Sequence, residues 1–326
     1  MRNLIRALAV TCLFMPVAFA GPQQQSSETS TAPPWAYPVN PPGLPQAKDD
    51  GSLKTVPGSP KSMTLTQTLD GYNVPDWRPD EHPPMPAVVE HGRKPDLRGC
   101  GYCHLPNGLG RPENASVAGL PASYIMQQVA DFRRGARKSS EPKMGPPLAM
   151  VGIANAATDE DVRQAAEYFS SLKLKPWIRV VEATTVPKTR VQGSMLVPVA
   201  GGGMEPIGNR IIELPEDLPR TELRDASSGF VAYVPVGSIK KGEALVTTGG
   251  GGKTTQCGIC HGPDLKGLGP VPPLAGRSPS YLFRQLYDIQ HGTRHGTWTE
   301  LMKAPLAKLS QDDLIAITAY LSSRTP

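Results

Sequence analysis

Two cysteine pairs are the residues of this chain best suited to chemistry. Residues 100–104 read CGYCH and residues 257–261 read CGICH. In each pentad two residues separate the thiols, and a histidine directly follows the second thiol. Paired thiols form disulfides, act as redox dithiols, bind zinc or attach a prosthetic group. The first three uses do not require the adjacent histidine, which both pentads supply.

Cys-x-x-Cys-His is the attachment signature of c-type haem. The two thiols add across the vinyl groups of the porphyrin, and the adjacent imidazole is held where it meets the iron. We therefore predict two covalently bound haem c groups. The predicted attachment residues are Cys100, Cys103, Cys257 and Cys260, and the predicted iron ligands from the pentads are His104 and His261.

The pentads belong to a longer internal repeat. A shift of 157 residues places Cys100 on Cys257 and continues without a gap until Arg137 falls on Arg294. Beyond that point the shift is 152, because the first copy has five extra residues. A match of this length indicates a duplicated domain.

Each copy is predicted to contain a middle helix and a last helix. The middle helices are expected at about residues 122–133 and 279–290, where apolar residues recur at helical spacing. The last helices are expected to begin at the capping boxes TDED, residues 158–161, and SQDD, residues 310–313. The chain is only 39% hydrophobic and 6% aromatic, so the porphyrin is expected to fill much of each core.

A second axial ligand is expected from methionine, whose soft thioether raises the reduction potential of haem iron. Met150 and Met302 occupy matching places in the two copies, each shortly before the last helix. Both are predicted iron ligands. Met144 is an alternative to Met150, because the five-residue insertion makes the alignment uncertain there.

The first 20 residues resemble an export signal. Arg2 and Arg6 precede an apolar stretch, and residues 18–20 read AFA, a cleavage pattern, before Gly21. We therefore expect a periplasmic protein. Cleavage after residue 20 would remove Arg2 and Arg6 and lower the net charge from +5 to +3. A net charge this small does not favour nucleic-acid binding.

The remaining segments complete the predicted organisation. Residues 21–75 are rich in Pro, Ser and Thr and are expected to form a disordered or wrapping arm. Residues 175–236 contain short β-prone runs broken by Pro and Gly, which predict an ordered connector with hairpins. The predicted haem domains are residues 76–174 and 237–326.

Both copies resemble the small class I cytochromes c of bacterial periplasms, in the tandem two-haem arrangement. The resemblance covers residues 90–174 and 237–326 and depends on the pentads, the helices and the two methionines. It implies mainly α-helical domains that enclose a haem. It also implies that the carbonyl of a loop proline orients the proximal histidine. Pro273 suits that role in the second copy, whereas the first copy reads SVAG at residues 116–119.

The predicted function is single-electron transfer between redox proteins, without substrate chemistry. Dehydrogenases or respiratory complexes are the expected donors, and oxidases or other cytochromes are the expected acceptors. The chain could also be a cytochrome subunit peripheral to a membrane complex. The alternative is a dihaem peroxidase, in which His82, His91, His291 or His295 would assist an open iron. The matching methionines favour the carrier, because a peroxidase needs two unlike sites.

Overall fold

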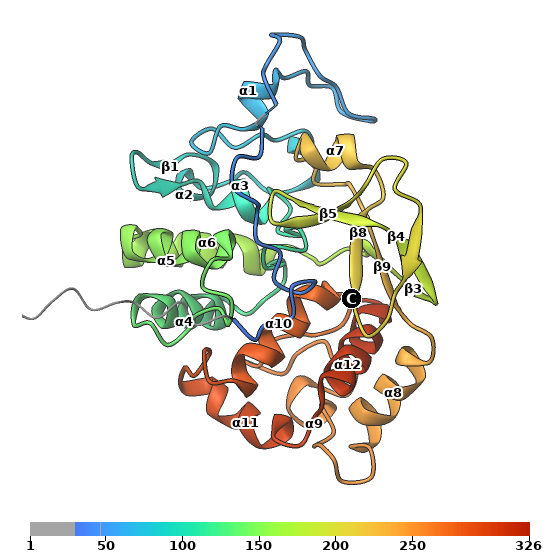
Figure 1. Ribbon diagram of the computed structural model, residues 1–326. Helices are drawn as coiled ribbons and strands as arrows, with labels where there is room; N and C mark the ends of the chain where they lie inside the picture. The colour runs from blue at the N-terminus through green and yellow to red at the C-terminus, as the bar shows by residue number, and fades with distance from the viewer. Residues whose placement is uncertain (1–29, 46) are drawn as a thin grey trace, which may run out of the picture. The chain divides into compact units, whose positions relative to one another are not determined.

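The computed structural model describes residues 30–45 and 47–326. The expected export signal and the first residues of the arm lie outside this part. The helices are α1 Leu65–Thr68, α2 Ala87–Glu90, α3 Cys100–His104, α4 Ala122–Arg133, α5 Gly145–Ala156, α6 Asp159–Ser171, α7 Leu218–Glu222, α8 Ser238–Thr248, α9 Gly258–His261, α10 Pro279–Gln290, α11 Glu300–Leu306 and α12 Gln311–Ser323 (Figure 1).

The strands are short and most lie between the two copies in sequence. Their bounds are β1 Gly92–Arg93, β2 Leu97–Arg98, β3 Ile178–Ala183, β4 Thr185–Pro187, β5 Thr189–Gln192, β6 Met195–Pro198, β7 Met204–Pro206, β8 Ile212–Pro215 and β9 Phe230–Pro235. The predominantly helical prediction for the two copies is confirmed.

The predicted middle and last helices are present in both copies. The middle helices α4 and α10 have the bounds that the apolar spacing indicated. The last helices α6 and α12 begin at complete capping boxes: the side chains of Thr158 and Ser310 accept from the backbone N–H of Asp161 and Asp313. Each aspartate in turn accepts from the backbone N–H of its cap residue. These reciprocal bonds satisfy donors that the first helical turn leaves free.

The two copies meet through side chains of α4 and α10 and of the turns that follow these helices. Arg137 of the first copy pairs with Arg294 of the second in an antiparallel bridge. Arg137 Nη2 donates to the Tyr281 hydroxyl at 2.8 Å, and Arg294 Nη2 donates to the Tyr124 hydroxyl at 2.9 Å. These four residues are repeat equivalents, so the contact is internally symmetric. The repeat therefore retained residues that join the two copies.

Residues 175–236 form three small sheets. In the largest, β9 lies between β3, to which it is parallel, and β8, to which it is antiparallel. Strands β5 and β6 form a hairpin, and β4 pairs with β7. The sequence indicated hairpins in this region, but not the parallel pairing of β3 with β9. That pairing joins residues about 50 positions apart, and local β-propensity does not specify such partners.

Part of the arm packs against the second copy. Ala36 and Tyr37 are buried in the same apolar cluster as residues of α10 and α12. The Tyr37 hydroxyl donates to Asp288 at 2.7 Å, and the ring of Trp35 contacts that of Phe283 with centroids 4.6 Å apart. The described arm residues 31–37 therefore contribute to the core of the second copy.

Candidate haem sites

Each pentad histidine is oriented by one main-chain carbonyl. His104 Nδ1 lies 2.9 Å from the Ala115 carbonyl oxygen, and His261 Nδ1 lies 2.8 Å from the Pro272 carbonyl oxygen. A carbonyl only accepts, so Nδ1 carries the proton in both rings. The lone pair of Nε2 is then available for a metal.

The orienting carbonyl of the second copy is that of Pro272, and the prediction of Pro273 was wrong by one residue. The Pro273 carbonyl instead accepts from Arg277 Nε at 2.8 Å. Ala115 and Pro272 are equivalent under the 157-residue shift, so both copies use the same loop position. The first copy needs no proline there because the bond uses only the main chain.

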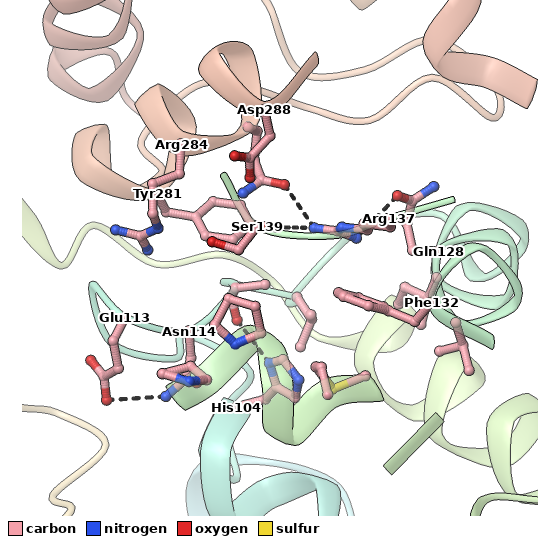
Figure 2. Close-up of a pocket in the computed structure, with 18 of the residues that line it drawn as sticks. His104, Glu113, Asn114, Gln128, Phe132, Arg137, Ser139, Tyr281, Arg284 and Asp288 are labelled. Atoms are coloured by element: carbon pink, nitrogen blue, oxygen red, sulfur yellow. Dashed lines mark hydrogen bonds between the residues drawn. The ribbon is translucent and has the colours of Figure 1, made fainter. Parts of the chain in front are cut away.

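A cavity of about 120 Å³, partly open to solvent, lies beside His104. In Figure 2 His104 forms one wall, and Arg137 and Tyr281 stand opposite. The apolar residues of α4 predicted to face a porphyrin line this cavity: Tyr124, Ile125, Val129 and Phe132. The site is therefore formed mainly by the first copy and closed by α10 of the second.

The three candidate methionines occupy different environments. Met150, on α5, lines the cavity that contains His104. Met144 is fully buried in the apolar cluster of the second copy and is not among the residues that line this cavity. Met302, on α11, is partly buried and packs against the cluster that also contacts Cys257. This arrangement favours Met150 over Met144 as the partner of His104.

The electrostatic environment suits ligation and not thiol redox chemistry. Burial lowers the pKa of His104 and of His261, which keeps both imidazoles neutral. Burial raises the pKa of Cys100 to about 12 and that of Cys257 to about 11. Such thiols stay protonated at neutral pH, unlike a reactive dithiol. All four pentad cysteines are free, and the described residues contain no cluster of three or more metal-binding side chains to indicate zinc.

The positions and charges of three buried arginines suit the propionate carboxylates of a haem. Arg137 and Arg284 line the cavity, and Arg294 lies beside it, bonded to Tyr124. Within the described part of the chain none of the three forms an ion pair, and Arg294 Nε is buried without a hydrogen-bond partner. Buried cations require compensating anions. Propionate groups would supply them, so donor set, cavity and charge all fit haem.

The histidines considered for an enzyme lie elsewhere. His104 is the one histidine among the described residues that line the cavity. His82 lies near Asp76 and the Tyr168 hydroxyl, and His91 is near Glu90 at the surface. His291 stacks on Tyr287. None of His82, His91 and His291 is among the described residues that line the first cavity.

The two pentads differ in their exposure. In the first copy, residues 221–226 contact the pentad and the loop after it: Arg224 Nη1 donates to the Tyr102 carbonyl, and the Ala226 carbonyl accepts from Asn107. The equivalent surface of the second copy is open, with Ile259 64% exposed and Leu268 58% exposed. Sequence reasoning missed this difference, because the pentads themselves are nearly identical.

Comparison with known proteins identifies the family. The family model described as cytochrome c matches residues 239–325. Cytochrome c-554(548) of Halomonas halodenitrificans is 38% identical over 73 residues, which are 22% of this chain and 88% of that protein. The chain belongs to the cytochrome c family.

Longer matches extend across both copies of this cytochrome. Cytochrome c4 of Stutzerimonas stutzeri is 26% identical over 231 residues, covering 68% of this chain and 82% of that protein. The thiosulfate dehydrogenase electron acceptor of Stutzerimonas stutzeri (strain A1501) is 27% identical over 238 residues, covering 72% and 83%. The predictions of covalent haem c at two sites and of electron transfer without substrate chemistry are confirmed.

Proposed function

We propose that this cytochrome is an exported dihaem carrier that accepts single electrons from a dehydrogenase and passes them to a downstream redox protein. The observation that supports it most is the paired anchoring of His104 and His261 by equivalent carbonyls. The name of one relative, a thiosulfate dehydrogenase electron acceptor, supports a dehydrogenase as donor. No helix in the described part of the chain has the length and apolar character of a membrane span.

The proposed attachment residues are Cys100 and Cys103 for the first haem and Cys257 and Cys260 for the second. His104 and His261 would bind iron through Nε2. Met150 and Met302 would supply the second axial ligands, a pairing that raises reduction potential. Bound haem supplies the one-electron chemistry, and the chain orients the ligands and excludes water from them.

The interface residues have a proposed part in charge balance. Arg137 and Arg294 are buried where the copies meet, and each reaches a tyrosine of the other copy. We assign them to hold the propionates of the two haems. Both haem edges would then approach this interface, which favours electron exchange between them.

Partner proteins are proposed to dock at the second pentad. The pentad helix α9 presents Ile259 and Cys260 to solvent, and Leu268 is exposed on the following loop. The same loop in the first copy is covered by residues 221–226. The open apolar surface is therefore the accessible edge for an electron-transfer partner.

Intact mass and ligand spectra test this function. The mature chain should exceed the polypeptide mass by two haems, and the near-infrared sulfur-to-iron band should report two methionine-ligated irons. Carbon monoxide should leave the reduced spectrum unchanged, since neither iron is open. A mass with one haem, or rapid carbon monoxide binding to the wild type, would contradict the carrier.

A further inference from the structure

We propose that Arg224, brought to the first pentad by residues 175–236, raises the reduction potential of the first haem relative to the second. The inference rests on the proposed dihaem function and concerns a residue outside both repeat copies. Arg224 would give the two haems different reduction potentials, although both have the same proposed ligand set.

Arg224 lies directly on the first pentad. Its guanidinium carbon is 3.6 Å from the centroid of the Tyr102 ring, and Nη1 donates to the Tyr102 carbonyl at 2.6 Å. Tyr102 immediately precedes Cys103, one of the two proposed attachment residues. The cation therefore stands at the edge of the first haem site.

The backbone of Arg224 is held in an unusual conformation. Its φ is 59°, in the left-handed region that residues other than glycine rarely adopt. Such strain persists only where the surroundings enforce it. Here Trp77 Nε1 donates to the Leu223 carbonyl on one side, and Asn107 donates to the Ala226 carbonyl on the other. The chain thus fixes the turn that presents Arg224.

The charge of Arg224 is not compensated by the nearby carboxylates. Asp225 pairs with Arg220 at 2.6 Å and with Arg78 at 3.4 Å. Glu113 pairs with Arg111 at 2.6 Å. Within the described residues no carboxylate lies within ion-pair distance of Arg224, and its Nε is buried without a hydrogen-bond partner. A guanidinium stays protonated in proteins, so a net positive charge remains there.

Among residues 30–45 and 47–326, no cation contacts the second pentad at the equivalent place. The position matching Tyr102 is Ile259, whose side chain is 64% exposed. Reduction adds an electron to the haem, so a fixed positive charge nearby stabilises the reduced state, more strongly when shielded from water. The first haem is therefore the higher-potential site. Electrons that enter at the exposed second pentad would settle on it.

The test is a spectroelectrochemical titration of the full dihaem protein. Arg224→Gln removes the charge and keeps a polar side chain, and Arg224→Gly also permits the positive φ. In both variants the reduction potential of the first haem should fall by about 59 mV. This shift corresponds to a tenfold change in a one-electron equilibrium. The Met150→Ala variant shows which of the two waves belongs to the first haem.

Two controls separate charge from packing. Arg190→Gln makes the same charge change at an exposed position on β5 of the same segment, and should leave both potentials unchanged. Arg224→Lys keeps the positive charge, so the reduction potential of the first haem should stay close to its wild-type value. Hydrogen exchange of residues 100–110 checks that the pentad stays folded in each variant.

Three results would overturn the inference. One is an unchanged first-haem potential in Arg224→Gln and Arg224→Gly. Another is an equal fall in both potentials. The third is a fall in Arg224→Lys as large as in Arg224→Gln, which would assign the effect to packing. A wild type without two one-electron waves would instead refute the dihaem function itself.

Discussion

At the scale of single residues, the main-chain carbonyls of Ala115 and Pro272 determine which nitrogen of each pentad histidine remains available for a metal. Because both bonds come from the backbone, side-chain substitution in the loop does not remove them. The methionines differ in this respect: each proposed thioether ligand depends on one side chain, and Met144 packs instead in the cluster of the second copy.

Removal of each proposed methionine ligand should open one iron. We expect Met150→Ala and Met302→Ala each to lose about half of the near-infrared sulfur-to-iron band, to lower one potential and to bind carbon monoxide. Met144→Ala should keep the whole band, but cost about 2–5 kcal/mol of unfolding free energy, because Met144 is fully buried. Half-loss of the band in Met144→Ala, with the full band in Met150→Ala, would transfer the ligand role.

His82 predicts a pH dependence of stability. Its hydrogen bond to Asp76 raises its pKa above the ordinary value. The resulting stabilisation is fully present below the unfolded-state pKa of about 6.5 and is lost as pH rises through the folded-state pKa. The unfolding free energy of wild type minus that of His82→Gln should therefore shrink from about pH 6 to pH 8. A difference that stays constant or grows would show that Asp76 does not stabilise charged His82.

At the scale of elements, the second copy depends on a close approach of α8 and α12. Gly242 on α8 faces the backbone of Ala316 on α12, and a Cβ at Gly242 would overlap the Ala316 carbonyl. Asp313 fixes the start of α12 by its cap bonds and also pairs with Lys241 of α8. The absence of a side chain at residue 242 is therefore what lets these helices pack.

Two glycine substitutions in helices should have opposite effects. Gly242→Ala should destabilise the protein by about 1–3 kcal/mol, because the helices must separate or the backbone must shift. Gly152→Ala is the matched control on α5, where an added Cβ would meet nothing within 4 Å. It should stabilise by roughly 0.5–1 kcal/mol, since alanine loses less backbone entropy in a helix. Denaturant unfolding measures both, and equal effects would refute the proposed close contact.

At the scale of the whole molecule, the interface between the two copies is symmetric, whereas the surroundings of the two pentads are not. The interface of α4 and α10 uses equivalent residues from both copies. The pentads, in contrast, are unequal, because residues 221–226 cover only the first. This combination suits a carrier in which both haems communicate internally while the second exchanges electrons with partners.

A charged substitution on the open surface should slow partner reactions. Leu268→Asp places a carboxylate on the exposed loop after the second pentad, and should reduce electron exchange with a partner several-fold through desolvation and lost apolar contact. Met204→Asp is the control, since Met204 is 57% exposed on β7 of the connector. Stopped-flow reduction measures both rates. Equal slowing by the two variants would contradict docking at the second pentad.

The cofactor, the duplication and the paired helices could be predicted because their signals are local. Haem attachment needs thiols two residues apart and an adjacent histidine, so five consecutive residues suffice to indicate it. Capping boxes and apolar spacing act within a few helical turns, and α4, α6, α10 and α12 accordingly begin where the sequence indicated.

Tertiary structure alone decided which residues from distant segments of the chain contact the pentads and the helices. Arg224 lies 122 positions from Tyr102, and nothing in the spacing of either residue indicates their contact. The same holds for Met144 in the core of the second copy, for Tyr37 bonded to Asp288, and for the parallel pairing of β3 with β9. Such contacts are selected by the shape and charge of surfaces that exist only after the elements have packed.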